Sequence, residues 1–221
     1  MSQQALSQQA AAQKTVLITG ASSGIGYATA QVLARAGYTV YASARKVEAL
    51  KSLEALGCRP LQLDATLERS RVDAVRQIEA EHGAVDILVN NAGYGLSGVV
   101  EELELEALRR EFETNVFGLV RLSQLVLPAM RAKGWGRIVN VGSAGGSFTA
   151  PGVGAYHASK YAVEAFSDAL RMERKLEALG WVWRSSSPRA YKPRSRPRSR
   201  GVLPYPPRTA LTALLPRTAL E

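Results

Sequence analysis

The chain has 221 residues, of which 46% are hydrophobic and 21% are charged, and its formal net charge at pH 7 is +9. This length suits one domain with a sizeable buried core, and no apolar run reaches membrane-spanning length, which argues against a transmembrane protein. Cys58 is the only cysteine, which excludes an internal disulfide and favours a reducing compartment, so we expect a cytoplasmic protein.

The positive charge is concentrated in one segment. Residues 184–221 contain nine Arg or Lys residues and one acid, whereas residues 1–183 contain nineteen bases and eighteen acids. The segments therefore carry +8 and +1, and the basicity belongs to a tail, not to the body. Residues 1–13 are polar and lack the apolar core of a secretion signal, so we interpret them as a flexible lead.

The first predicted unit joins a strand to a helix through glycines. Residues 14–19 predict a buried strand and residues 27–36 a helix, and the segment between them reads Gly20-Ala21-Ser22-Ser23-Gly24-Ile25-Gly26. Such a turn lets the backbone approach a phosphate and presents the free N–H groups of the helix start. The spacing differs from the commoner G-x-G-x-x-G, so a plain strand–helix turn stays open. We predict dinucleotide contacts at Gly20, Ser22, Ser23, Gly24, Ile25 and Gly26.

The second predicted strand, residues 37–43, ends at Ala44 and Arg45. An acid after this strand would bind a ribose 2′-hydroxyl, whereas a base suits a 2′-phosphate. The nearest acid is Glu48. The sequence therefore favours NADP over NAD, and the alternative for Arg45 is a solvated charge.

The alternation of strand and helix continues along the chain. Further apolar runs predict strands at residues 59–63, 85–89 and 137–141, and helical patterns cover residues 47–56, 67–82, 103–133 and 155–179. Pro128 predicts a kink near the end of the third of these helices. Continuously apolar strands that alternate with helices predict an α/β protein with a doubly wound parallel sheet. Polar or glycine clusters follow the strands, at the edge where such sheets bind ligands.

A proton-transfer site is predicted after the last of these strands. Tyr156 and Lys160 are four residues apart, which puts them on one face of a helix, and a nearby ammonium favours a phenolate. The hydroxyl of Ser143, after residues 137–141, is suited to hold a substrate oxygen. The Y-x-x-x-K spacing alone indicates a surface tyrosine and lysine, so the rest of the chain has to support the site.

In combination, these motifs resemble the short-chain dehydrogenase/reductase family over about residues 14–180. The matching positions are Thr19-Gly20-x-x-x-Gly24-x-Gly26, Asp64, Asn90-Asn91-Ala92-Gly93, Asn115, Ser143, Tyr156 and Lys160. The segment 91–95 and the surroundings of Asn115 look most like the hydroxysteroid-dehydrogenase-like branch. The resemblance implies a Rossmann-type fold and hydride transfer between a nicotinamide and an alcohol or carbonyl.

The resemblance also implies roles for single residues. Tyr156 would be the acid/base and contact the substrate with Ser143, while Lys160 would hold the nicotinamide ribose. Asn115 would order a water relay, although a buried asparagine in a helix is usually a structural hydrogen bonder. The cofactor-binding set would also include Asp64, Asn91, Ala92 and Gly93, the first two beside the adenine and its ribose. His157 has no such role, and no metal is expected.

The resemblance stops near Gly180, where the family continues with an apolar sixth strand that ends in Pro-Gly, followed by a seventh. Residues 181–221 are instead rich in Arg, Pro and Ser, which favours disorder, and the sheet would lack its last strands. We hypothesise a reading-frame shift: with G- or C-ending codons, Arg-Ser-Ser-Ser-Pro-Arg-Ala becomes Val-Val-Val-Ala-Pro-Gly one base out of frame. A naturally divergent terminus is the alternative.

Three functions follow from these observations. The first is an NADP-dependent oxidoreductase that interconverts a small-molecule alcohol and a carbonyl, and the second is a truncated dinucleotide-binding protein with little or no catalysis. The third is nucleic-acid binding by the basic tail, which has few aromatic residues and no recognition motif, so we expect no specific nucleic-acid partner. A homodimer through the long helices is left open.

Overall fold

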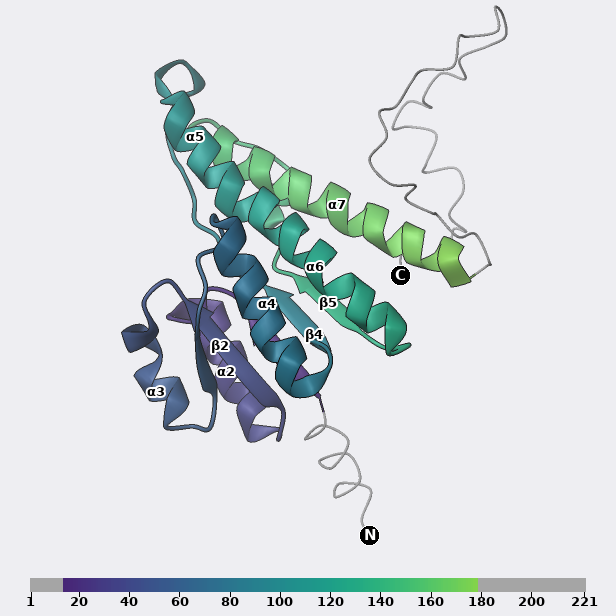
Figure 1. Ribbon diagram of the computed structural model, residues 1–221. Coiled ribbons are helices and arrows are strands. Elements are labelled where there is room, and N and C mark those ends of the chain that lie inside the picture. The colour runs from purple at the N-terminus through teal and green to yellow at the C-terminus, as the bar shows by residue number, and fades with distance from the viewer. Residues whose placement is uncertain (1–13, 179–221) are drawn as a thin grey trace, which may run out of the picture. The chain divides into compact units, whose positions relative to one another are not determined.

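The computed structural model describes residues 14–178, so the predicted lead and the basic tail lie outside the described residues. A parallel sheet forms its centre (Figure 1). It has five strands in the order β3-β2-β1-β4-β5. The strands are β1 (Thr15–Ile18), β2 (Thr39–Ala44), β3 (Arg59–Gln62), β4 (Ile87–Asn90) and β5 (Arg137–Asn140). Each lies within two residues of its predicted range. The predicted α/β class and parallel, Rossmann-like sheet are confirmed.

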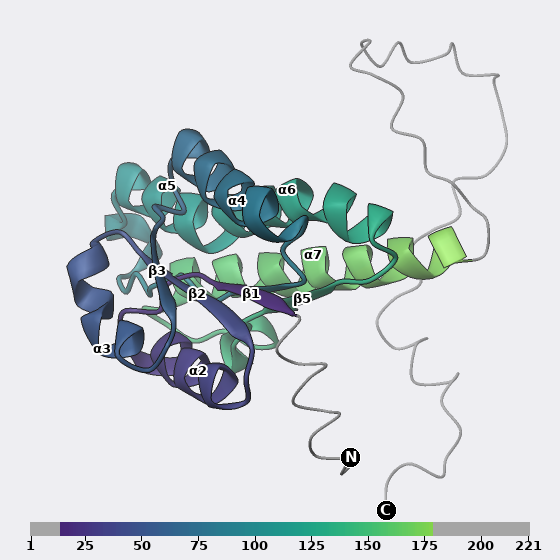
Figure 2. The same cartoon turned by 60° about the horizontal axis from the view of Figure 1, so that its bottom comes forward.

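Both faces of the sheet are covered by helices, which explains why the strands are apolar without alternation. In Figure 2, α4 and α6 lie on one side of the sheet, and α2 and α3 lie on the other. The helices are α2 (Gly24–Arg35), α3 (Lys51–Glu54), α4 (Glu68–His82), α5 (Leu105–Phe112), α6 (Gly118–Ala132) and α7 (Gly154–Ala178). Short 3₁₀ turns cover Val47–Leu50, Val100–Glu102 and Ala144–Gly146.

The strand β1 shows how alternate residues serve the two faces. Leu17 packs with Leu88 and Leu122 in a core cluster on the α4 and α6 side, whereas Val16 and Ile18 belong to the cluster on the α2 side. Val16, Leu17 and Ile18 have no exposed surface. This fully buried central strand fixes the turn that follows it, where the candidate site begins. None of the helices among residues 14–178 is long and apolar enough to cross a membrane.

The long helix predicted over most of residues 103–133 is present from Leu105 to Ala132, but it contains a π-helical turn that the sequence did not indicate. The structure contains α5, a π-helical turn at Glu113–Phe117 and then α6, which continues through Pro128 to Ala132. A side chain at Gly118 would place its Cβ 2.5 Å from the carbonyl oxygen of Ala65, so the helix passes the loop after β3 at a distance that only glycine permits. The extra residue per turn in the π segment brings Asn115 into a buried position, where its exposure is 1%.

A buried carboxylate joins the amino-terminal ends of β1 and β4. Asp86 has no exposed surface and accepts hydrogen bonds from the Thr15 backbone N–H at 2.9 Å and the Thr15 hydroxyl at 3.1 Å. The Lys133 ammonium lies 2.7 Å from the other carboxylate oxygen. Burial alone would raise the pKa of Asp86, but the hydrogen bonds from Lys133 and Thr15 outweigh it and lower this pKa. These contacts tie α6 to the end of the sheet opposite the candidate site.

The strand β5 pairs with β4 only, so among residues 14–178 it is an edge strand. Ile138 packs partly against the core on the α6 side, but Val139 on the opposite face is 49% exposed. Asn140 donates to Ser167 of α7 at 2.8 Å and accepts from Asn90 of β4 at 3.0 Å. The edge is therefore held by β4 and α7, and within the described part of the chain no strand pairs with the other side of β5.

Candidate functional site

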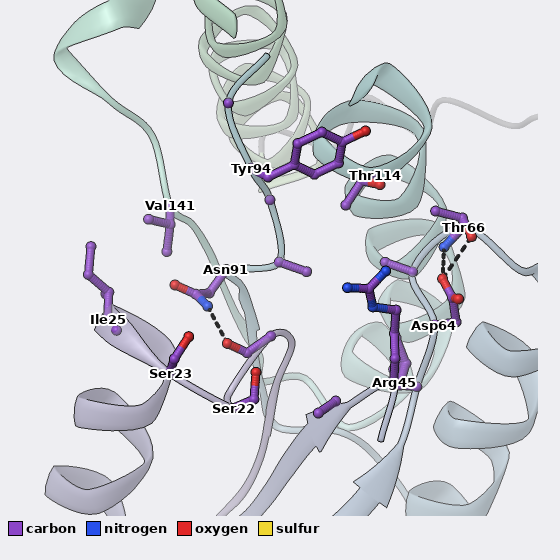
Figure 3. A pocket seen from close by; sticks show the side chains of 18 of the residues that line it. Ser22, Ser23, Ile25, Arg45, Asp64, Thr66, Asn91, Tyr94, Thr114 and Val141 are labelled. Atoms are coloured by element: carbon purple, nitrogen blue, oxygen red, sulfur yellow. Dashed lines mark hydrogen bonds between the residues drawn. The ribbon is translucent and has the colours of Figure 1, made fainter. Parts of the chain in front are cut away.

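A cleft of about 950 Å³ opens at the carboxyl-terminal end of the sheet (Figure 3). Twelve of the predicted site residues line it: Gly20, Ser22, Ser23, Gly24, Ile25, Arg45, Asp64, Asn91, Ala92, Gly93, Tyr156 and Lys160. The structure thus brings together the glycine turn, the end of β2, the segment after β4 and the start of α7. Gly26, Asn115 and Ser143 are not among the lining residues.

The glycine turn presents the start of α2 to the cleft. Gly20 and Gly24 have φ angles of +65° and +58°, a region that side chains other than Gly rarely adopt. Ser23 precedes the helix in an extended conformation, and its hydroxyl makes no capping hydrogen bond. Because the first N–H groups of a helix have no intrahelical acceptors, this end of α2 is suited to an anion.

Asn91 holds the glycine turn in place. Its side-chain N–H₂ donates to the carbonyl oxygens of Thr19 at 2.9 Å and Gly20 at 3.0 Å. The Thr19 hydroxyl accepts from the backbone N–H of Asn91 at 3.0 Å and of Ala92 at 2.9 Å. A Cβ on Gly26 would lie 2.4 Å from the Asn91 nitrogen, so Gly26 makes room for this clamp. Asn91 therefore has a structural role, besides lining the cleft, that the sequence did not reveal.

Arg45 extends from the end of β2 into the cleft, between the glycine turn and Thr66 (Figure 3). Arg45 is exposed, and among the described residues its guanidinium forms no ion pair or hydrogen bond. Asp64 accepts from the Thr66 backbone N–H at 2.9 Å and from the Thr66 hydroxyl at 2.7 Å. The aspartate thus closes the turn into α4, while the arginine is the cationic group at this end of the cleft.

Tyr156 and Lys160 lie one turn apart at the start of α7, as their spacing predicts. The Lys160 ammonium is 5.8 Å from the centroid of the Tyr156 ring and donates to the Val141 carbonyl at 2.8 Å. Lys160 is only 7% exposed, and this burial lowers its pKa, against which the charges of Glu111 and Glu164 act. A buried ammonium beside a partly buried tyrosine can assist proton transfer at the phenol.

Asn115 and Ser143 lie in the supporting structure. The Asn115 amide donates to the Tyr94 carbonyl at 2.8 Å and to the Ser159 hydroxyl at 3.0 Å, and its oxygen accepts from the Tyr94 N–H at 3.0 Å. It therefore links the segment after β4 to α7. Ser143 follows β5, and its hydroxyl accepts from the Gly145 N–H at 3.1 Å, which starts the Ala144–Gly146 turn.

Two further polar residues near the site are buried, and of these the sequence analysis missed Glu111. Glu111 has no exposed surface, and one of its oxygens accepts from the Leu96 N–H at 2.9 Å, whereas the other has no partner among the described residues. Burial raises the pKa of Glu111, and the N–H of Leu96 and the charge of Lys160 oppose this. His157, 7% exposed, stacks edge-to-face on Phe148 at 5.2 Å and supports the loop after Ser143.

Three comparisons relate the chain to known proteins. Residues 14–178 match the family model for short chain dehydrogenases. The chain is 44% identical over 159 residues to a 3-ketodihydrosphingosine reductase of Bacteroides thetaiotaomicron and 41% identical over 162 residues to the uncharacterized oxidoreductase YbbO of Escherichia coli. A crystal structure of a short-chain dehydrogenase from Streptomyces avermitilis superposes with a TM-score of 0.71 at 42% identity.

These matches cover only part of each protein. They span 72%, 73% and 72% of this chain, but 57%, 60% and 60% of the Bacteroides, Escherichia and Streptomyces proteins. The family-model match, residues 14–178, contains the sheet, the glycine turn and the Tyr156–Lys160 pair. The remainder of each relative has no matched counterpart in this chain.

Proposed function

The chain belongs to the short-chain dehydrogenase family, and from this premise we propose that it is an NADP-dependent oxidoreductase that interconverts an alcohol and a carbonyl. The observation that carries the proposal is the shared cleft. Tyr156 and Lys160 line the same cavity as the glycine turn, so a group bound along this turn extends toward a phenol that can exchange a proton.

The residues of the cleft fit a dinucleotide. Gly20, Gly24 and Ile25 surround the start of α2, where an anion is favoured, and at Gly20 a Cβ would lie 2.9 Å from the Cα of Ala92. Gly26 and Asn91 would hold this turn in shape, while Ser22 and Ser23 would donate to phosphate oxygens. Asp64 and Asn91 would lie beside the adenine and its ribose, as the resemblance implies, and Ala92 and Gly93 would line the same cleft.

The proton chemistry is assigned to Tyr156. When bound, the nicotinamide supplies a hydride to a carbonyl carbon or accepts one from an alcohol carbon. In the reducing direction, the Tyr156 phenol gives its proton to the carbonyl oxygen, and in the oxidising direction the phenolate takes the hydroxyl proton. Lys160 stabilises the phenolate and holds the ribose, Ser143 orients the substrate oxygen, and Asn115 orders the water that returns the proton.

Arg45 supports the choice of NADP. It lines the cleft next to the glycine turn, and no acid occupies the end of β2, where a carboxylate would repel a 2′-phosphate. An uncommitted guanidinium is suited to form charge-assisted hydrogen bonds to such a group.

A second function is favoured by the edge strand and by the share of the relatives that the chain covers. If the segments beyond residue 178 do not complete the substrate side, the protein binds a dinucleotide without turnover.

Membership of the hydroxysteroid-dehydrogenase-like branch and a cytoplasmic location remain predictions that belong to the proposed oxidoreductase function. A homodimer through the helices has support from exposed apolar residues on α5 and α7: Leu105, Phe166 and Met172. Sedimentation velocity would test it.

The experiment uses the purified 221-residue protein with NADPH or NADP and a panel of ketones and alcohols that includes 3-ketodihydrosphingosine. Tyr156→Phe removes the transferable proton, so turnover should fall by about 10²–10⁴-fold while cofactor binding is retained. Tyr161→Phe on the same helix, away from the cleft lining, is the matched control. Unchanged turnover in Tyr156→Phe would reject the acid/base role. Cofactor binding without turnover of any compound would select the second function.

A further inference from the structure

A buried acid lies near the Tyr156–Lys160 pair. Glu111 has no exposed surface, and α5, which carries it, packs against α7 (Figure 1). Its Oε1 accepts from the Leu96 N–H at 2.9 Å, whereas its Oε2 is buried without a hydrogen-bond partner among the described residues. A carboxyl group buried in this way costs stability unless a nearby charge or donor compensates it. The proton transfer assigned to Tyr156 and Lys160 does not use this acid.

Glu111 shapes the wall next to Tyr156. Together with Asn115, one helical turn further on, it hydrogen-bonds to the backbone of the segment after β4. Gly95 of this segment lies against the Tyr156 ring, because a Cβ at this position would be 3.5 Å from a ring carbon. Glu111 binds the N–H of the next residue, Leu96. It therefore fixes the backbone against which Tyr156 packs.

The charge of Glu111 also acts on Lys160. The Lys160 ammonium is buried, and burial lowers its pKa because the charged form loses hydration. Among the charges that oppose this effect, that of Glu111 is the largest. In turn, burial raises the pKa of Glu111, and the charge of Lys160 opposes that change. Each of the two buried groups therefore stabilises the charged form of the other.

Other charged or titratable groups surround this pair. On α5, the π-helical turn, α7 and the segment after β4, those in or beside the cleft are Tyr94, Arg110, Glu113, Tyr156, His157 and Glu164. The carboxylate of Glu113 is paired with Arg71 at 3.2 Å. That of Glu164 also opposes the lowered pKa of Lys160, but Glu164 is exposed, so water and salt screen its charge. Among the described residues, Glu111 is therefore the main source of negative charge at the ammonium.

We propose that Glu111 is a positioning residue of the oxidoreductase reaction, whose buried carboxylate keeps the Lys160 ammonium charged beside Tyr156. This role rests on the proposed function, since it explains how a buried lysine retains the proton with which it stabilises the Tyr156 phenolate. Without the carboxylate, Lys160 loses its proton at lower pH, and the phenolate then loses its neighbouring cation. The stability that a buried, ionised acid costs is a consequence of this role.

The test measures the charge of Lys160 directly, in the 221-residue protein without cofactor. The Lys160 Cε resonance, assigned with a Lys160→Arg variant, is followed by NMR in isotope-labelled protein as pH rises. In Glu111→Gln the midpoint of this titration should fall by about one pH unit, because the ammonium loses its main counter-charge. Glu111→Asp keeps the charge and should restore most of the midpoint. Glu106→Gln, which alters an exposed acid of the same helix outside the cleft lining, is the matched control and should leave it unchanged.

Stability and turnover distinguish this role from a structural one. If Glu111 only held Leu96, Glu111→Gln would lower the melting temperature and the turnover while the Lys160 midpoint stayed in place, and that result would overturn the proposal. In an active protein, the alkaline limb of the pH–rate profile, where Lys160 loses its proton, should move to lower pH in Glu111→Gln by the same amount as the midpoint. A limb that stays in place would also overturn it. A shifted midpoint in a protein that turns over no compound would support the charge coupling and reject the proposed function alone.

Discussion

Gly26→Ala tests how the glycine turn is held. The new Cβ would lie 2.4 Å from the Asn91 side-chain nitrogen and 2.6 Å from the Gly20 carbonyl oxygen, whereas real Cβ contacts below 3.0 Å are essentially never seen. The Asn91 nitrogen must then move by 0.6 Å, the difference between 3.0 and 2.4 Å. This movement weakens its hydrogen bonds to Thr19 and Gly20, which measure 2.9 and 3.0 Å.

The free-energy cost follows from these contacts. Overpacking costs about 1–3 kcal/mol, and each weakened hydrogen bond about 1 kcal/mol. The higher helix propensity of alanine returns about 0.5–1 kcal/mol, so we expect a net loss of about 2–4 kcal/mol. Urea unfolding followed by circular dichroism measures it, and NADPH titration should show weaker binding because the turn is displaced. Gly134→Asn, which lies outside the cleft lining, is the control, since nothing lies within 4 Å of its Cβ and asparagine tolerates a φ of +70°. A Gly26→Ala protein within about 0.5 kcal/mol of wild type would refute the reasoning.

Three further outcomes are expected. Arg45→Asp should lower NADPH affinity about 10- to 100-fold relative to NADH, because it replaces attraction for the 2′-phosphate by repulsion. Lys46→Asp, which lies outside the cleft lining, should leave this ratio unchanged. Equal shifts for both variants in cofactor titrations would contradict the role of Arg45. Glu111→Gln should raise the melting temperature at pH 7–8 but not near pH 4. Burial raises the pKa of Glu111 in the folded protein, so the wild type loses folding stability as pH rises above the unfolded-state pKa of ~4.3. A melting-temperature difference between variant and wild type that does not change with pH would argue against this reasoning. Lys133→Met should cost about 1–3 kcal/mol at pH 7, measured by denaturant unfolding, because Asp86 loses its cation. The pKa of Asp86 is lowered in the folded wild type, so the loss of stability caused by Lys133→Met should shrink as pH falls below ~4 and Asp86 takes up a proton.

The sheet was predictable because its signal is local. Runs such as Val16-Leu17-Ile18 are apolar at every position, and each is bounded by glycine or polar residues, so the strands and the cleft edge followed from the sequence. The spacing of Tyr156 and Lys160 was enough to place both on one face of α7.

The features that the sequence did not reveal depend on contacts between distant segments. The π-helical turn lies where α6 approaches Ala65. The apolar period of about 3.6 residues in the sequence continues across this turn and therefore gives no sign of it. Glu111 lies in a charged stretch that is typical of a solvated helix face, yet it is fully buried under Leu96. The inward orientation of Asn91 likewise depends on the carbonyls of Thr19 and Gly20, which no local pattern encodes.

The ion pair between Asp86 and Lys133 lies at the opposite end of the sheet from the cleft. A designer of new enzymes can use this separation, because changes that strengthen one end of the strands leave the loops at the other end free to vary. Libraries that randomise the cleft loops would then start from a scaffold that Thr15, Asp86 and Lys133 stabilise against destabilising loop substitutions. Strengthening these contacts first, for instance by a second cation near Asp86, should enlarge the fraction of loop variants that still fold.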